Sequence, residues 1–190
     1  MSIYAAILKW SGVLLLKRVQ KYLKDNTLDI IFLIVVAIVA FYVTKSFAIL
    51  NIIGESMFPT YTSGDVLILK KSKEPSIQDI IVFESPESWS EEPGGKQYIK
   101  RIVASEGDIV HFKNSYLKVN NDEPLFIDRP FCKINDVKVV IGKNKYFVLG
   151  DNITNSNDSL TQMCLNNLEY TVDESLISYF GEEIFTFTKH

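Results

Sequence analysis

The chain has 190 residues, of which 47% are hydrophobic, and its formal net charge is −3. This length is enough for one domain of about 140 residues and one additional segment. The lack of a basic excess excludes a general nucleic-acid-binding protein, so we expect no nucleic-acid partner. The two cysteines, Cys132 and Cys164, form no CxxC pair, which argues against a metal site. They are either bridged, if the domain is extracytoplasmic, or two small buried hydrophobic side chains.

The first 27 residues are apolar and basic. Ile3–Leu16 is apolar but contains Lys9, Trp10 and Ser11, which favours a helix lying in a membrane interface. A second membrane span is the alternative for this segment. The basic residues that cluster before residue 28 are Lys9, Lys17, Arg18, Lys21 and Lys24.

Leu28–Phe47 is predicted to be a transmembrane helix. As a helix, these 20 residues are about 30 Å long, which matches the hydrocarbon core of a bilayer. Asp29 and Lys45 lie near its ends and can reach the headgroups. A buried core helix is the alternative, but no polar face interrupts Ile30–Val43. No small-x-small cleavage site follows before Gly54, so we interpret the segment as an uncleaved anchor rather than a cleaved signal peptide.

The basic cluster also predicts the orientation of this anchor. Positive residues usually flank a membrane helix on its cytoplasmic side. We therefore expect residues 1–27 in the cytoplasm or its interface, a single span over 28–47, and residues 48–190 outside the cytoplasm.

The remaining chain is predicted to be mainly β, as one antiparallel domain. Short runs rich in β-branched and aromatic residues alternate with turn residues such as Gly, Asn, Asp and Pro. Residues 84–95 are expected to form a loop or flap, and a short helix is expected near Asp173–Tyr179. The expected strands are Val66–Leu69, Ile80–Phe83, Tyr98–Val103, Ile109–Phe112, Tyr116–Val119, Val137–Ile141 and Tyr146–Leu149.

Ser56 and Lys100 are the candidate nucleophile and base. A serine hydroxyl reacts only when a base removes its proton, and lysine can serve if burial lowers its pKa from about 10.4 toward neutrality. Alternation along the strand places Lys100 and Arg101 on opposite faces, so one can be buried while the other stays charged. A solvated Lys-Arg pair and a turn serine are the alternatives that do not involve catalysis. His111 and His190 are less suitable bases, because one lies in a predicted hairpin and the other ends the sequence.

Four blocks together resemble bacterial type I signal peptidases (leader peptidases), over roughly residues 30 to 160. The resemblance implies a signal-peptidase-type fold and a membrane-bound serine–lysine endopeptidase that needs no metal or cofactor. The blocks are Gly54–Thr60, Gly64–Lys71 with Gln78–Pro86, Tyr98–Val103 ending in Gly107-Asp108, and Tyr146–Asn152 with Asn155–Ser159.

The resemblance also implies a role for individual residues. The serine matching Ser56 attacks the scissile carbonyl and the lysine matching Lys100 takes its proton. The backbone N–H of Ser56 would hold the oxyanion, while Gly54 stands where some relatives have a serine hydroxyl as a second donor. The serine matching Ser156 orients the lysine amine. Asp151 and Asp158 match aspartates that brace the site, and the arginine matching Arg101 supports them.

Some positions depart from the family's pattern, which indicates a divergent member. Leu160 follows the final Asp-Ser where an arginine is usual, so Arg101 is the remaining candidate partner for Asp158. Ile153 and Thr154 replace positions that are commonly charged. Ala104-Ser105-Glu106 replaces a usual Gly-x-Pro, and little is recognised from Leu160 onward.

The expected activity is therefore removal of signal peptides from exported proteins at the cell membrane. The resemblance implies preprotein substrates that bind as an added strand, pockets for Ala-like side chains, and contact with membrane lipid. One alternative is a specialised peptidase of the conjugative-pilin or mitochondrial inner-membrane type. Another is a self-cleaving repressor protease, which the N-terminal anchor argues against. A third is an inactive, membrane-anchored peptide-binding relative. The oligomeric state is not predicted.

Overall fold

The computed structural model describes residues 17–18, 21–72, 74–89, 96–134, 136–165 and 169–188. The chain divides into two compact units, Met1–Lys45 and Ser46–His190. The segment Ile3–Leu16, for which an interfacial helix was predicted, lies outside the described residues.

The first unit contributes one long helix, α2 (Thr27–Ser46). Its mean hydropathy is 2.5, and it is long and apolar enough to cross a membrane. Asp29 lies in the first turn and Lys45 in the last, where each charge is favourable to the helix dipole. No residue of α2 is buried within the described structure, which argues against the alternative of a core helix. The helix begins and ends one residue earlier than predicted, because Phe47 already belongs to the first strand.

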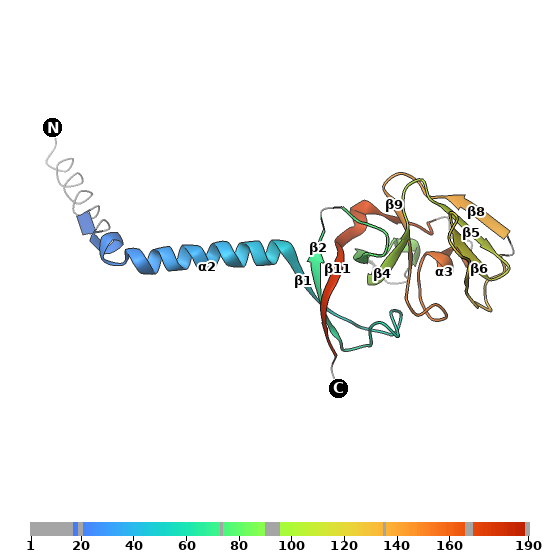
Figure 1. Cartoon of the computed structure of the whole chain (residues 1–190), viewed down its shortest axis with the longest axis horizontal. Helices are drawn as coiled ribbons and strands as arrows, with labels where there is room; N and C mark the ends of the chain where they lie inside the picture. The colour runs from blue at the N-terminus through green and yellow to red at the C-terminus, as the bar shows by residue number, and fades with distance from the viewer. Residues whose placement is uncertain are drawn as a thin grey trace. The chain divides into compact units, whose positions relative to one another are not determined.

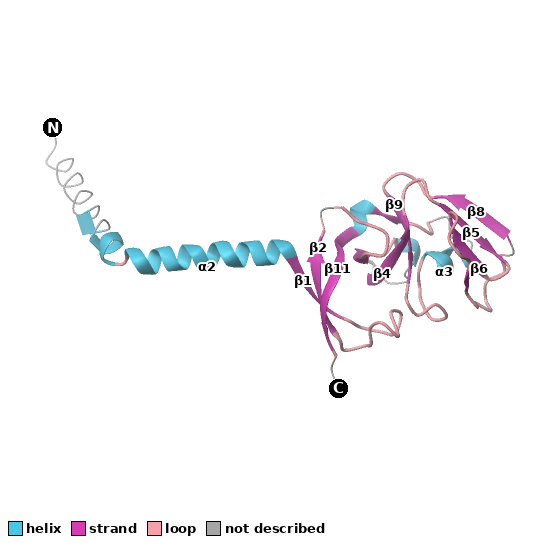
Figure 2. Ribbon diagram, in the orientation of Figure 1, coloured by secondary structure: helices cyan, strands magenta, loops and turns pink. Residues whose placement is uncertain are grey.

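The second unit is built from antiparallel strands in two sheets (Figure 2). The larger sheet has the order β1-β2-β11-β3-β4-β9-β10 and the smaller one the order β7-β6-β5-β8. The seven predicted strands are confirmed with small changes at their ends, as β2, β3, β4, β5, β6, β8 and β9. The strand bounds are β1 (Phe47–Asn51), β2 (Val66–Lys71), β3 (Ile80–Glu84), β4 (Gln97–Ala104), β5 (Ile109–Lys113), β6 (Tyr116–Val119), β7 (Leu125–Phe126), β8 (Asp136–Val140), β9 (Lys145–Leu149), β10 (Val172–Asp173) and β11 (Ile177–Phe187).

The C-terminal strand β11 lies inside the larger sheet, between β2 and β3 (red in Figure 1). The short helix predicted near Asp173–Tyr179 is therefore wrong. Only a 3₁₀ turn, Glu174–Leu176, is present there, and β11 starts at Ile177. The register of β11 shifts at two points, once against each neighbouring strand. Such bulges interrupt the two-residue alternation that identifies a strand in a sequence.

Three apolar clusters hold this unit together. One joins the inner face of the smaller sheet to β9 and to α3 (Ser159–Cys164), a six-residue helix that was not predicted. A second surrounds Met57 and Tyr61 against β1 and β2. The third lies between β3, β4 and β9 and contains an aromatic group of Phe83, Trp89 and Tyr98. Trp89 belongs to a 3₁₀ turn, Glu87–Trp89, in the predicted loop.

Cys132 and Cys164 form a disulfide, which decides between the two predicted alternatives. The bridge joins the segment before β8 to the last residue of α3. It therefore connects a loop of the smaller sheet to the helix that follows the candidate site.

Candidate active site

Ser56 lies in a series of turns between β1 and β2. Met57 next to it is almost fully buried and anchors the segment in the second apolar cluster. Two bonds attach the turn to the loop that follows β9. The Asn152 N–H donates to the Ser56 carbonyl at 3.0 Å, and its side-chain amide donates to the Glu55 carbonyl at 2.9 Å. Asn152 was not among the predicted site residues, although it belongs to a quoted motif.

Lys100 is placed by the alternation of β4. Lys100, Ile102 and Ala104 are buried, and Arg101 between them is only partly buried. Lys100 is only 1% exposed. Its Nζ donates to Ser56 Oγ at 2.7 Å and to the Ile99 carbonyl at 2.8 Å. The structure thus brings together two side chains that lie 44 residues apart in the sequence.

Burial lowers the pKa of Lys100 from 10.5 to about 8. The cause is the loss of hydration of the charged amine, which disfavours the protonated form. The charges of Asp158 and Asp151 oppose this effect and raise the pKa, and Arg129 lowers it. A lysine in this environment is neutral often enough near neutral pH to accept a proton from a hydroxyl.

Arg101 points to the other face of β4 and pairs with Asp151. Its Nε and Nη2 donate to the two carboxylate oxygens at 2.9 and 2.7 Å, and Nη1 donates to the Gln78 carbonyl at 2.9 Å. This forked pair joins β4 to the first residue after Gly150. It fixes the start of the loop that carries Asn152.

The predicted partner of Asp158 was wrong. Asp158 pairs with Arg129, a residue that the sequence did not point to, whereas Arg101 donates to Asp151 and to the Gln78 carbonyl. Arg129 lies between β7 and β8, 29 residues before Asp158. Leu160, at the position of the usual family arginine, is completely buried in the first apolar cluster. The missing arginine was the only sequence signal that Asp158 needed another partner.

Ser156 and Gly54 lie near the dyad without the contacts expected of them. The Ser156 hydroxyl is buried and makes no hydrogen bond within the described part of the chain, so it does not hydrogen-bond to the Lys100 amine. Gly54 has a positive φ of 88° that suits glycine. Its N–H donates to Ser63 Oγ at 3.2 Å, and so is not available to an oxyanion in this conformation. The roles assigned to both residues remain predictions.

Asn157 is a further residue of the site that sequence reasoning missed. Its side-chain amide donates to the Tyr98 hydroxyl at 3.0 Å and to the Trp89 carbonyl at 3.1 Å. The Tyr98 ring lies 5.4 Å from Lys100 Nζ. Asn157 therefore joins the loop that follows β9 to the aromatic group beside the lysine. By contrast, His111 lies in β5 of the smaller sheet, where its Nε2 is 2.7 Å from Asp136 Oδ1.

Comparison with known proteins assigns the family. The model of the family "Signal peptidase, peptidase S26" matches residues 26–167, so the chain belongs to that family. It is 29% identical over 178 residues to signal peptidase I P of Bacillus subtilis subsp. natto, covering 85% of this chain and 93% of that one. It is 31% identical over 150 residues to the probable signal peptidase I-1 of a Synechocystis strain, covering 73% and 74%.

A solved structure is also similar to part of the chain. It is a signal peptidase I from Enterococcus faecalis, 22% identical, which covers 56% of this chain and 96% of its own. The TM-score is 0.38, so this match adds nothing to the family assignment.

Proposed function

We propose that this chain is a membrane-anchored serine endopeptidase that removes N-terminal signal peptides, with Ser56 as nucleophile and Lys100 as general base. The observation that carries the proposal is the 2.7 Å contact between Lys100 Nζ and Ser56 Oγ, made by a buried amine whose pKa is lowered to about 8. Membership of the signal peptidase family gives the class of reaction and the class of substrate, which is a preprotein.

The proposed reaction starts from the neutral amine. Lys100 accepts the hydroxyl proton while Ser56 Oγ attacks the scissile carbonyl, and the oxyanion is held by the Ser56 N–H. The tetrahedral intermediate then collapses to an ester on Ser56, and Lys100 returns the proton to the leaving amine of the mature protein. Water, deprotonated by the same lysine, then attacks the ester carbonyl. The bond to Ser56 Oγ breaks, Lys100 returns the proton to Oγ, and the signal peptide leaves with a new C-terminal carboxylate. No step needs a metal or a cofactor.

The Arg101–Asp151 pair and the Asn152 bonds are proposed to hold Ser56 against Lys100. Both contacts fix the loop that follows β9, and Asn152 binds the carbonyl of Ser56 itself. Productive geometry of a nucleophile and base depends on such support, because a displacement of about 1 Å can lower the rate 100-fold. The site therefore has the features of a functioning enzyme, which speaks against the inactive peptide-binding alternative.

Anchoring by α2 is proposed to keep the nucleophile close to the membrane. Ser56 follows Phe47, the first residue after α2, by only nine positions. The basic residues before α2 support a cytoplasmic N-terminus and an extracytoplasmic catalytic domain at the cell membrane. A signal peptide presents its cleavage site at that same surface.

The substrate is proposed to bind in an extended form along β1 and the residues that follow it. β1 is an outer strand of the larger sheet as described, and an outer strand can accept an added strand through backbone hydrogen bonds. By the family resemblance, small pockets that admit Ala-like side chains are proposed for the first and third positions before the cut.

The test is to incubate the full chain in detergent micelles with a preprotein and to sequence the new N-terminus. We expect one cut, directly after an Ala at the end of the signal peptide. A preprotein with Phe in place of that Ala should be cut at least about tenfold more slowly, because overpacking a small pocket costs about 1–3 kcal/mol. Equal kcat/KM for both substrates, or cuts scattered in the mature sequence, would contradict signal-peptide specificity.

A further inference from the structure

The most deeply buried ion pair of the described chain lies beside the proposed dyad and not in it. Arg129 is 1% exposed at its side chain and Asp158 is 0% exposed. Two parallel bonds of 2.7 and 2.8 Å join the guanidinium to the carboxylate. Taking two charges out of water is expensive, and such a pair is often no more stabilising than hydrophobic residues of the same size. The pair therefore matters mainly for the segments that it holds in place.

The Asp158 carboxylate accepts hydrogen bonds from three residues, Gly150, Thr161 and Arg129. Its Oδ2 accepts the Gly150 N–H at 3.1 Å, and its Oδ1 accepts the Thr161 N–H at 3.1 Å as the N-cap of α3. The carboxylate thus fixes both the start of the loop after β9 and the helix that ends it. Its remaining acceptor positions are filled by Arg129.

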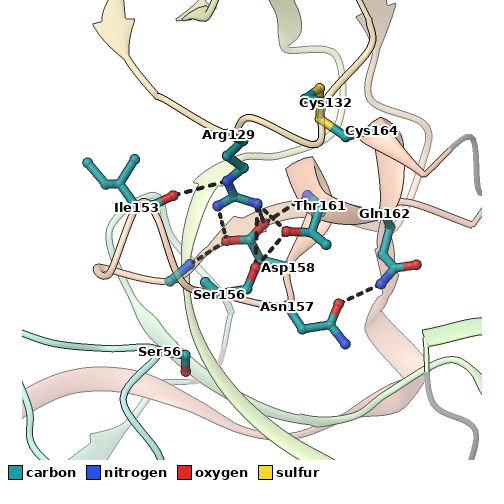
Figure 3. A network of polar contacts seen from close by, with 12 residues as sticks. Ser56, Arg129, Cys132, Ile153, Ser156, Asn157, Asp158, Thr161, Gln162 and Cys164 are labelled. Atoms are coloured by element: carbon teal, nitrogen blue, oxygen red, sulfur yellow. Dashed lines mark hydrogen bonds and ion pairs between the residues drawn. A yellow bond between two sulfur atoms is a disulfide. The ribbon is translucent and has the colours of Figure 1, made fainter.

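Arg129 binds the same loop from its outer side (Figure 3). Its Nε donates to the Ile153 carbonyl at 3.0 Å, and Nη1 lies 3.5 Å from the Ser156 carbonyl and also contacts the Thr161 hydroxyl. One guanidinium therefore holds the middle and the end of the loop, while Asp158 holds its beginning. The loop between Gly150 and Asp158 is closed around this pair.

The inner side of the same loop is in contact with Ser56. Asn152 N–H donates to the Ser56 carbonyl, and a methyl group at Gly150 would overlap that carbonyl and the Ser156 hydroxyl. The backbone of the loop thus packs directly on the nucleophile. A movement of the loop outward would move Ser56 or remove its support.

The disulfide fixes the backbone close to Arg129. Cys132 lies three residues after Arg129, and its partner Cys164 ends the helix that Asp158 caps (Figure 3). The Cys132 N–H also donates to the Arg129 carbonyl at 2.8 Å. The arginine is therefore attached at its backbone to α3 and at its side chain to the loop.

From these contacts we infer that Arg129 is a positioning residue for the Ser56–Lys100 dyad, acting through Asp158 and the backbone of residues 150–158. It pairs with Asp158 in a chain whose position after the final Asp-Ser is occupied by the buried Leu160. The inference rests on the proposed function of the dyad.

The charges near Lys100 provide a readout that a purely structural role would not affect. Asp158 and Asp151 raise the pKa of Lys100, and Arg129 lowers it. The acid limb of the kcat/KM profile is the part that rises with pH as Lys100 loses its proton. Removing the charge of Arg129 should therefore move this limb to higher pH. Removing the charge of Asp158 should move it to lower pH. A general loosening of the fold has no reason to give opposite signs.

The experiment compares Arg129→Gln, Arg129→Lys and Asp158→Asn in the full chain, with preprotein cleavage measured across pH 6–10. We expect Arg129→Gln to lower kcat by about 10- to 100-fold with little change in KM, because the nucleophile is displaced rather than the substrate site. Arg129→Lys keeps the charge but loses the forked geometry. It should recover part of kcat and keep the wild-type acid limb.

Two controls separate positioning from stability. Lys133→Gln removes an exposed cation of the same segment and should leave kcat and the acid limb unchanged. The double variant Cys132→Ser/Cys164→Ser removes the disulfide but keeps both charges, so its acid limb should stay at the wild-type pH even if its melting temperature falls. If the acid limb of this variant shifted as far as that of Arg129→Gln, the inference would be overturned.

The remaining outcomes are also decisive. If the wild type shows no Ser56-dependent cleavage, the proposed function itself fails. If the wild type cleaves and a folded Arg129→Gln variant has the same kcat and acid limb, only the role of Arg129 is overturned. If Arg129→Gln does not fold, the test rests on Arg129→Lys and Asp158→Asn. An Asp158→Asn variant whose acid limb coincides with that of the wild type would reject the inference.

Discussion

Burial of Lys100 gives the proposed chemistry its pH dependence. The pKa of this amine is lowered from 10.5 to about 8, so the protonated form predominates below that pH and the neutral base above it. We expect kcat/KM to rise about tenfold per pH unit below 8 and to level off above it. The measurement is preprotein cleavage from pH 6 to pH 10. A flat profile over this range would exclude a base that titrates as Lys100 does.

Arginine at the same position should abolish this activity. A guanidinium stays protonated, with a pKa above about 12, so Lys100→Arg keeps the charge but cannot accept the Ser56 proton. Cleavage by this variant should be lost at every pH, while circular dichroism remains that of the wild type. Activity that persists would mean that another group is the base.

Gly150 offers an independent test of the loop behind the nucleophile. A methyl group there would overlap the Ser56 carbonyl and the Ser156 side chain, so the loop must move away from the site. Gly150→Ala should lower kcat/KM by about 100-fold. Gly142→Ala is the matched control, because its methyl would meet only a Lys145 side-chain carbon at 3.7 Å. Similar activity in the two variants would show that the loop does not position Ser56.

At the residue scale, the sequence predicted the site only where local patterns apply. Alternation along one strand separated Lys100 from Arg101, and the motif blocks supplied Ser56. The pairing of Arg129 with Asp158 depends on tertiary contact between segments 29 residues apart. No spacing rule connects them, and the departure at Leu160 indicated a missing partner without identifying its replacement.

For the helices and strands too, the regular patterns were predicted and the irregular ones were missed. Strands with uninterrupted alternation and clear turn residues, such as β5 and β6, were predicted almost to the residue. β11 was missed because two shifts in register break its alternation. α3 was missed because six residues are too few for a helical period, and its start depends on the Asp158 cap and on packing.

Gly181 tests the position of β11 within the sheet. A methyl group there would overlap the backbone carbonyl of Lys70 in β2, so the two strands could not keep their pairing. Gly181→Ala should lower the free energy of unfolding by about 1–3 kcal/mol. Thermal unfolding of this variant and of Gly142→Ala makes the comparison. An unchanged midpoint for Gly181→Ala would contradict the central position of the strand.

At the scale of the whole molecule, composition and hydropathy were enough to divide the chain. The apolar segment predicted over 28–47 is the helix Thr27–Ser46, and the residues from Ser46 onward form one compact unit. The side of the membrane on which each part lies depends on insertion, which the fold of the isolated chain does not determine. That orientation is therefore a prediction from the distribution of basic residues.

A topology experiment checks this orientation. Protease is added to cells in which it can reach the outer face of the cell membrane. A tag before Met1 should be protected, and a tag after His190 should be digested. The expectation follows from the basic residues that precede a single span. Digestion of both tags, or protection of both, would mean that Ile3–Leu16 spans the membrane as well.

Replacement of Ser56 is the most direct test of the proposed function. The full chain and its Ser56→Ala variant are compared for cleavage of one preprotein, with the exposed serine variant Ser72→Ala as control. Because no other hydroxyl is proposed to attack, Ser56→Ala should lower kcat by about 10⁴-fold or more, with an unchanged melting temperature. Ser72→Ala should cleave as the wild type does. Cleavage by Ser56→Ala within tenfold of the wild type would contradict the serine–lysine mechanism.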